Sequence, residues 1–509
     1  MRFSRLLPVL VGLLLLQFNA SNAQQKPNII IFISDDHAYQ TIGAYGSKYG
    51  KTPNIDRIAN EGAVFENMYV NNSICGPARA TLLTGKYSHK NGFKDNETSN
   101  FDFNQNLFVK DLQQSGYNTA WVGKIHLGHQ LQGFDYYDIL VGQGHYFNPD
   151  FISKDGRKRE EGYVSDLVTS KAIHWMQEVK DDAPFCLVIG HKATHRTWMP
   201  DPKDFGKYDK VNFELPNTLF DDYKTRVAAS TQEMTIAEHM HMGYDLKMFP
   251  SKEAMFVDGN FTRMNESQKQ AYMDYYLPIY EELEKLKLAG DKLTEWKYKR
   301  YMTDYLNTAE SMDRNIGDVL DYLDKNGLKD NTIVIYLSDQ GFYMGEHGWY
   351  DKRFMYEESF RTPFVIRYPK LITPKSHIKA QTINVDIAPT LLDLAGVKLR
   401  DDLQGKSFKP SLINANKKHR DNIYYHYFEN GEHAVSPHFG VRDSRYKLIR
   451  FYKRHNQWEL FDLAKDPNEL NNVYTDKAYQ KIVVKMKKKL LKEIKAFDDA
   501  DALAIYNQK

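Results

Sequence analysis

Four short runs of almost wholly hydrophobic residues interrupt the more polar chain. They span residues 28–33, 117–122, 185–189 and 331–337. Continuous apolar runs of this length are typical of strands that are buried on both faces of a parallel sheet. Helical stretches lie between them, for example over residues 305–326. This alternation predicts an α/β fold with a large, mixed but mostly parallel sheet sandwiched by helices.

The pattern changes twice further along the chain. Residues 204–300 are rich in Tyr, Met and charged side chains, and we interpret them as a mostly helical insertion near the rim of the site. After residue 400, short apolar runs separated by polar turns predict an antiparallel sheet, followed by a basic amphipathic helix. We therefore predict a main domain over residues 24–400 and a smaller C-terminal α+β subdomain over residues 401–509. The expected C-terminal strands are 423–427, 439–442, 446–451 and 458–462, and the helix is 478–497.

The first 23 residues have the pattern of a secretory signal peptide. Two arginines precede an apolar run at residues 6–16, and small residues at 21–23 offer a cleavage site. The run is too short to span a bilayer, and no later segment is apolar enough to do so. We therefore expect an exported protein without a transmembrane segment, in a bacterial periplasm or secreted.

Composition narrows the function classes. The chain has 68 Lys and Arg against 66 Asp and Glu, so its charge gives no reason to expect nucleic acid as a partner. Its two cysteines exclude a disulfide scaffold. Cys186 lies in an apolar run and is interpreted as a packing residue, and the lysine-rich segment 485–495 as a solvated helix face.

The other cysteine, Cys75, has a different setting. Pro77 and Arg79 follow it, and Pro fits the first turn of a helix because its missing N–H would be unpaired there. Residues four apart share a helix face, so Arg79 is expected on the same face as Cys75. Free N–H groups and the positive end of the helix dipole gather at a helix start. The segment predicts an anion pocket around one sulfur atom.

Oxygen ligands follow two of the apolar strands. Asp35 and Asp36 come after the first strand, and Asp339 and Gln340 come after the last. In α/β sheets, sites lie beyond the carboxyl ends of the strands. Adjacent carboxylates repel each other unless a cation neutralises them, and carboxylate and amide oxygens suit Ca²⁺ or Mg²⁺. The pattern predicts a site for one hard cation.

Taken together, these motifs resemble the signature of the type I, formylglycine-dependent sulfatases. Cys75, Pro77 and Arg79 with Thr84-Gly85 match the family's Cys-x-Pro-x-Arg and Thr-Gly pattern, although Ala78 stands where the family usually has Ser. The resemblance implies an alkaline-phosphatase-like fold. It also implies that Cys75 becomes formylglycine through a formylglycine-generating or anaerobic sulfatase-maturating enzyme.

The resemblance also assigns roles one residue at a time. It implies that a calcium ion, or alternatively Mg²⁺, is bound by the strand-end oxygens and converted Cys75. Two lysines would bind sulfate oxygens, one histidine would assist the formylglycine hydroxyl, and another would protonate the leaving alcohol or hold the sulfate. Arg79 would stabilise the nucleophile. The metal ligands are then Asp35, Asp36, Cys75, Asp339 and Gln340. The sulfate-binding lysines are Lys124 and Lys352. His126 is the histidine that assists the formylglycine hydroxyl, and His195 is the one that protonates the alcohol or holds the sulfate.

The segments around residues 338–349 and 354–359 look most like bacterial carbohydrate sulfatases acting on glycosaminoglycans or mucin glycans. The substrate implied is a sulfated saccharide, with the 6-O-sulfate of N-acetylglucosamine favoured. A 2-O- or 3-O-sulfatase, a phosphonate or phosphodiester hydrolase of the same superfamily, and a non-catalytic glycan-binding protein are the alternatives. Candidate sugar contacts, each equally explained as a surface or core side chain, are His145, His347, His433, His438 and Arg442.

Overall fold

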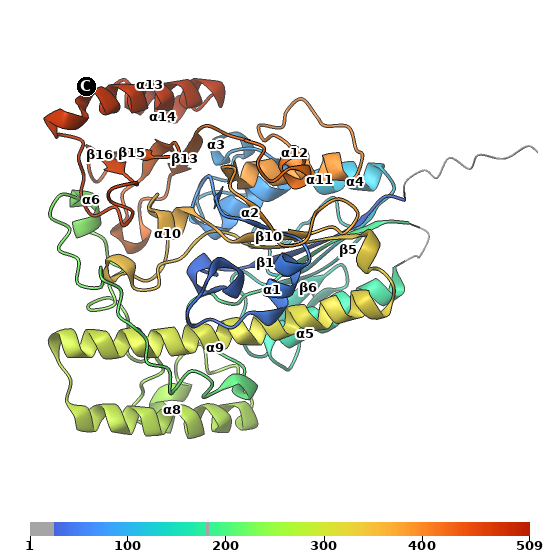
Figure 1. Ribbon diagram of the computed structural model, residues 1–509. Coiled ribbons are helices and arrows are strands. Elements are labelled where there is room, and N and C mark those ends of the chain that lie inside the picture. The colour runs from blue at the N-terminus through green and yellow to red at the C-terminus, as the bar shows by residue number, and fades with distance from the viewer. Residues whose placement is uncertain (1–24, 180–182, 509) are drawn as a thin grey trace, which may run out of the picture.

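Residues 25–179 and 183–508 are described by the computed structural model of the protein (Figure 1). The predicted signal peptide at residues 1–23 lies outside them. Within the described residues, no helix is both long and apolar enough to cross a membrane.

A large sheet forms the centre of the molecule. Within the described residues it has ten strands, and the five from β9 to β5 are parallel to one another, while β10, β6 and β7 introduce antiparallel pairings. This confirms the predicted mixed, mostly parallel sheet. The spatial order is β11 (Ser376–Ile378), β2 (Ala63–Phe65), β10 (Phe364–Arg367), β9 (Thr332–Ser338), β1 (Asn28–Ser34), β8 (Phe185–Gly190), β4 (Asn118–Gly123), β5 (Tyr136–Leu140), β6 (Asp150–Ser153) and β7 (Gly156–Arg159).

Helices cover both faces of this sheet (Figure 1). Alternate residues of β1 point to opposite faces: Ile30 and Phe32 belong to one apolar core, and Ile29 and Ile31 to the other. Burial on both sides explains why β1 is a continuous apolar run rather than an alternating one. One core is completed by α1 (Pro53–Asn60), α5 (Val164–Glu178) and α9 (Gly290–Lys325), and the other by α2 (Cys75–Thr84), α4 (Phe108–Gln114), α11 (Ile387–Leu394) and α12 (Lys409–Ile413).

The four strands predicted from the sequence are neighbours in the order β9, β1, β8, β4. Ile33 of β1 pairs with both Leu337 of β9 and Gly190 of β8, so the carboxyl ends of these strands lie level. Gly123 at the end of β4 has a φ of 91°, and a Cβ atom there would lie 2.1 Å from the Gly190 carbonyl oxygen. Only glycine fits this close approach, which fixes where the chain leaves β4.

The predicted insertion at residues 204–300 is less helical than expected. Residues 205–250 run mainly through turns, with the short helix α6 (Val227–Ser230). Helix α7 (Lys252–Phe256) and helix α8 (Glu266–Leu286) follow, and α9 then starts at Gly290, so the expected boundary at residue 300 falls inside a helix. Tyr and Met side chains pack well in loops as well as helices, which is why composition alone misled the interpretation.

The C-terminal region matches its prediction closely. Four antiparallel strands form a second sheet, and α13 (Gln480–Ala496) packs across it with α14 (Ala500–Tyr506) beside it (Figure 1). The hydroxyl of Tyr425 in this sheet donates to the carbonyl oxygen of Arg353, 2.6 Å away, and so ties the sheet to the main domain. The strands are β13 (Ile423–Tyr427), β14 (His438–Arg442), β15 (Tyr446–Phe451) and β16 (Gln457–Asp462).

Candidate active site

Cys75 occupies the first position of α2, as the sequence predicts. Ile74 before it is extended, and Pro77 lies in the first turn of the helix. The Cys75 side chain is buried, and Asn96 Nδ2 donates to its Sγ over 3.6 Å. Burial, above all, raises the pKa of the thiol, so Cys75 as encoded is a poor thiolate nucleophile.

Arg79 links the start of α2 to the ends of two strands. Its Nε donates to Asp339 Oδ2 over 3.0 Å, and its Nη1 donates to the carbonyl oxygen of Lys124 over 2.6 Å. Its side chain is fully buried. A buried guanidinium with a carboxylate and a carbonyl acceptor is held rigidly, and it places the Asp339 side of the site relative to the Lys124 side.

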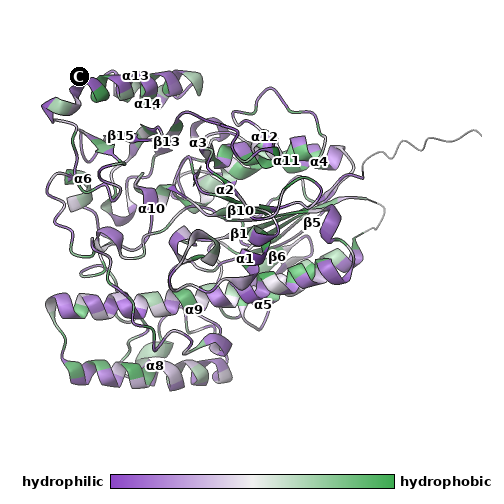
Figure 2. Cartoon of the chain, in the orientation of Figure 1, coloured by the Kyte–Doolittle hydropathy of each residue, from purple (hydrophilic) through white to green (hydrophobic). Residues whose placement is uncertain are grey.

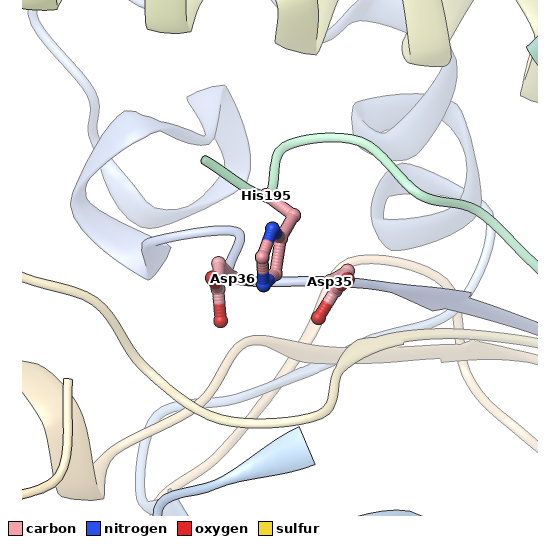
Figure 3. Close-up of side chains that lie close together, drawn as sticks. All are labelled: Asp35, Asp36 and His195. Atoms are coloured by element: carbon pink, nitrogen blue, oxygen red, sulfur yellow. Dashed lines mark ion pairs between the residues drawn. The ribbon is translucent and has the colours of Figure 1, made fainter. Parts of the chain in front are cut away.

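The predicted oxygen ligands lie in two groups that share Asp35, and Gln340 Nε2 donates to Asp36 Oδ1. Oxygens of Asp35 and Asp339 and the Cys75 sulfur all lie within 4.8 Å of one another, and so do ligand atoms of Asp35, Asp36 and His195. Figure 3 shows the His195 ring between the two aspartates. The backbone N–H of Asp36 also donates to Asp339 Oδ1 over 3.2 Å. Asp36 adopts a φ of 68°, a strained value for a residue with a side chain, as is common at functional sites.

These residues fit a hard divalent cation. Asp35 Oδ1 and Gln340 Oε1 are buried acceptors without a hydrogen-bond donor among the described residues. Burial raises the pKa of Asp36 to about 7 against the pull of Lys352, and burial with the charge of Asp35 raises that of Asp339 to about 6. Buried carboxylates this close together repel one another. A bound cation would relieve that repulsion, and the oxygens that lack a hydrogen-bond donor would coordinate it.

The two predicted sulfate-binding lysines pair with different carboxylates. Lys124 Nζ donates to Asp35 Oδ2 and to the side-chain oxygen of Gln143. Lys352 Nζ lies 2.7 Å from both carboxylate oxygens of Asp36. The charge of Lys124 and the other nearby cations outweighs burial at Asp35 and holds its pKa well below the usual value. The lysines therefore supply positive charge directly beside the proposed cation ligands.

The two predicted histidines are both neutral in this setting. Burial and then the charge of Lys124 lower the pKa of His126 to about 3, and its Nδ1 has no hydrogen-bond partner in the described chain. Burial also lowers the pKa of His195 well below its usual value. His195 Nδ1 lies 2.7 Å from the Arg196 carbonyl oxygen and must donate to it, so Nε2, which is 3.9 Å from Asp36 Oδ2, is an acceptor.

Three of the five candidate sugar contacts are buried among protein partners. His438 uses both ring nitrogens, with Ser436 O at 2.8 Å and Met355 N at 3.0 Å. Arg442 pairs with Glu357 at 2.9 Å, and His347 lies 3.2 Å from Asp221 in a fully buried cluster. The isolated histidines and arginine in the sequence do not reveal this pairing. We therefore do not retain His347, His438 and Arg442 as sugar contacts.

The other two candidates, His433 and His145, lie beside residues whose neighbours or side chains reach the site. His433 Nε2 is 3.0 Å from Asp351 Oδ2, and Asp351 is the neighbour of Lys352. His145 is partly exposed on the loop that carries Gln143. A cavity of about 190 Å³ opens beside His126. Its lining also includes Asn96, the residue that contacts Cys75.

Three residues at the site are missing from the sequence interpretation: Asn96, Gln143 and Lys192. Lys192 is 5% exposed, and its Nζ donates to the backbone oxygen of Gln143 over 3.1 Å. Burial lowers the pKa of Lys192 to about 7. A signal existed for Gln143, because it lies between two glycines at a strand end, whereas Asn96 lies in a polar loop without any pattern.

Comparison with known proteins agrees with this geometry. Residues 27–397 match the Sulfatase family, and residues 345–496 match the family described as N-sulphoglucosamine sulphohydrolase, C-terminal. A Bacteroides thetaiotaomicron protein named N-acetylglucosamine-6-O-sulfatase is 44% identical over 490 residues, which cover 94% of this chain and 88% of the relative. An arylsulfatase from Clostridium perfringens is 25% identical, with 93% and 95% covered.

A solved structure is also very similar. It contains a protein in complex with its substrate D-glucosamine-2-N,6-O-disulfate, and the two chains share 43% identity with a TM-score of 0.92. The alignment covers 95% of this chain and 100% of the other. The chain therefore belongs to the sulfatase family and has its alkaline-phosphatase-like fold. It is an enzyme of the sulfuric ester hydrolase class, as the motifs around Cys75 predict.

Proposed function

We propose that the protein removes the 6-O-sulfate from N-acetylglucosamine or a related glucosamine in glycosaminoglycans or mucin glycans. The observation that carries the proposal is the 44% identity to the N-acetylglucosamine-6-O-sulfatase across 94% of the chain. Similarity at this level extends through both regions that border the site, the main sheet and the C-terminal sheet. A 2-O- or 3-O-sulfated sugar and a phosphonate or phosphodiester are the alternative substrates.

The proposal includes a modified Cys75 and one divalent cation. A formylglycine-generating or anaerobic sulfatase-maturating enzyme would convert Cys75 to formylglycine. The hydrate of formylglycine would then supply the oxygen nucleophile. Calcium, or Mg²⁺ in its place, would be held by Asp35, Asp36, Asp339 and Gln340 with the modified residue 75. Such a cation acts as a Lewis acid that withdraws charge from the sulfate oxygens.

Each protein group then has a distinct task. Lys124 and Lys352 neutralise sulfate oxygens, because each ammonium has three donors and can keep its carboxylate while it binds the ester. His126 is neutral with a free Nδ1, so it can accept a proton from the nucleophile. Arg79 holds Asp339 and the Lys124 backbone in place.

His195 has a narrower range of roles than the family resemblance implies. Its Nε2 is an acceptor in the neutral ring, so protonation of the leaving alcohol requires the ring to become charged first. The charge of Asp35 favours that charged form against burial and the nearby lysines, and the negative charge of a bound sulfate ester would add to it. We propose that His195 takes up its proton only after substrate binds.

The sugar itself is proposed to lie between the Gln143 loop and the loop that carries Asp351. His145 and His433 stand on these two sides and remain the proposed sugar contacts. We retain the division into a catalytic domain over 24–400, with the 204–300 insertion, and a C-terminal subdomain over 401–509. Export by the signal peptide at 1–23, to a periplasm or the medium, completes the proposal.

Two measurements test the proposal. Sulfate release is assayed on 6-O-, 3-O- and 2-O-sulfated glucosamine derivatives, with aryl phosphate and phosphonate esters in parallel. We expect the 6-O-sulfated sugar to be the preferred substrate. A preference for a phosphate or phosphonate ester would exclude a sulfated sugar as the main substrate. The mass of the Cys75 peptide from the native host is expected to be lower by roughly 18 Da, the step from thiol to aldehyde.

A further inference from the structure

Helix α13 has one face buried and the opposite face lined with lysines. Val483, Met486, Leu490 and Ile494 pack into the core beneath the helix. Seven lysines occur in α13, of which Lys489 pairs with Asp443 and Lys487 lies over the Trp458 ring. The remaining five are exposed, with no ion pair among the described residues: Lys481, Lys485, Lys488, Lys492 and Lys495.

These five lysines form a single row. Their spacings of four, three, four and three residues return to the same side of a helix each time. The row extends for roughly 20 Å at about 1.5 Å per residue. Because lysines and apolar residues lie on different faces of α13, hydrophilic and hydrophobic colours alternate along the helix in Figure 2.

Charge is concentrated on this helix to an unusual degree. Its seven lysines and one glutamate give it a net charge of +6, whereas the whole chain carries +2. The rest of the protein is therefore net negative. A solvated helix face in such a protein would normally mix both signs, because a row of like charges repels itself. An anionic partner would relieve that repulsion.

A hollow adjoins the lysine row at the C-terminal end of the helix. It has a volume of about 490 Å³, and Lys492 of α13 and Lys406, which precedes the C-terminal sheet in the chain, are both among its lining residues. Asp421, Glu493, Gln404 and Asn422 also line it. The Gln404 amide already bonds Tyr87 N and the Phe497 carbonyl oxygen. Asn422 Nδ2 donates to Glu493, so Asn422 Oδ1 is the amide atom left without a partner among the described residues. The two lysines suit the anionic groups of a ligand, and the Asn422 oxygen suits one of its hydroxyls.

We propose that the lysine row of α13, with this hollow, is an exosite for a sulfated polysaccharide chain. The inference rests on the proposed function, since a glycan that carries the scissile sulfate carries further sulfates along its length. A lysine ammonium is a compact charge on a flexible stem, so a row of them can follow regularly spaced sulfates without a fixed geometry. The exosite would raise the local concentration of polymer near the enzyme.

An anionic membrane surface is the less favoured partner. Amphipathic helices that bind bilayers insert their apolar face, and the apolar face of α13 is already buried in the protein. Val484, at 53% exposure, is the one large apolar residue of α13 that is exposed. Long-range attraction to lipid headgroups alone would remain.

The test compares two fivefold variants on the Cys75→Ala background, which prevents turnover. One variant replaces the five row lysines by Gln. The control replaces five exposed lysines without ion pairs elsewhere, so it removes the same charge. The control positions are Lys252, Lys285, Lys287, Lys292 and Lys299.

Calorimetric binding of a heparin dodecasaccharide is expected to weaken at least tenfold in the row variant and less than threefold in the control. With Cys75 intact, both variants should release sulfate from a monosulfated monosaccharide at the wild-type rate. Equal loss in both variants, or no loss in the row variant, would overturn the exosite. The exosite would also be overturned if the row variant lost binding to phosphatidylserine vesicles but kept its binding to the dodecasaccharide. If the wild type binds the dodecasaccharide through the row but cleaves no sulfated sugar, the proposed function fails and the exosite stands.

Discussion

Lys352 Nζ lies 2.7 Å from each carboxylate oxygen of Asp36, so a proposed sulfate ligand is in direct contact with a proposed metal ligand. Burial works against the charged form of Lys352, but the charge of Asp36 and other nearby acids raises its pKa. Lys352 is thus positively charged at neutral pH. Its positive charge is shared between Asp36 and any sulfate that enters.

Replacement of Lys352 by Ala is therefore expected to lower kcat by about a hundredfold or more, the usual cost of removing one preorganised donor. Initial rates of sulfate release from the preferred substrate measure this. Lys90→Ala serves as the control, because Lys90 makes a comparable pair with Asp498 at the surface. A Lys352→Ala enzyme within a factor of five of the wild type would contradict the assigned contact with sulfate.

Asp339 accepts hydrogen bonds that hold the site together, and it also carries a negative charge for the proposed cation. A single substitution can remove the charge and keep the shape of the side chain. Its side chain accepts from Arg79 and from the Asp36 backbone, and a carboxamide keeps its shape. Asp339→Asn is expected to abolish most of the rise in melting temperature that Ca²⁺ produces in the wild type, because one ligand charge is lost. The measurement is a thermal shift against Ca²⁺ concentration in chelator-treated protein. An unchanged Ca²⁺ response in this variant, with Asp222→Asn as the surface control, would argue against Asp339 as a ligand.

The Gln143 side-chain oxygen accepts a hydrogen bond from Lys124. Because the Gln143 side chain is neutral, this bond leaves the positive charge of Lys124 available for the sulfate. Gln143→Ala leaves the lysine with its charge and removes a hydrogen bond that forms with or without substrate, so KM is expected to change by no more than about threefold. Gln143→Glu places a carboxylate beside the lysine and should raise KM at least tenfold through repulsion of the sulfate. Steady-state kinetics with Gln132→Glu as the control distinguish these effects. Equal KM values for the Ala and Glu variants would remove Gln143 from the substrate path.

The parts of the fold and site that could be predicted share a physical cause. Strands β1, β4, β8 and β9 are buried on both faces, so their sequences are unmistakably apolar, and the residues that follow them must gather at one edge of the sheet. Asp35 and Asp339 were located in this way. The structure of residues 205–250 could not be predicted, because turns packed on a core carry no periodic signal.

The sugar contacts were the weakest part of the prediction for a similar reason. His438 and His433 are five residues apart and look alike in the sequence. One is buried with both nitrogens paired, and the other contacts Asp351 at the site. Only tertiary packing distinguishes them, because the partners come from distant segments.

The buried His438 also makes stability depend on pH. Burial lowers its pKa to about 3, whereas an unfolded histidine titrates near 6.5. Between these values the unfolded chain binds one more proton than the folded chain, so the free energy of unfolding falls as the pH falls below about 6.5. The contribution of this one residue is about 2 kcal/mol between pH 8 and pH 5.

His438→Gln removes that titration. We expect the variant to be less stable than the wild type at pH 8, because the Met355 N–H loses its imidazole acceptor, and the difference should narrow by about 2 kcal/mol at pH 5. Urea unfolding at the two pH values measures both differences. His174→Gln, at an exposed position on α5, should leave the wild-type pH dependence intact. A gap between wild type and His438→Gln that stays constant from pH 8 to pH 5 would mean that His438 is not held neutral by its burial.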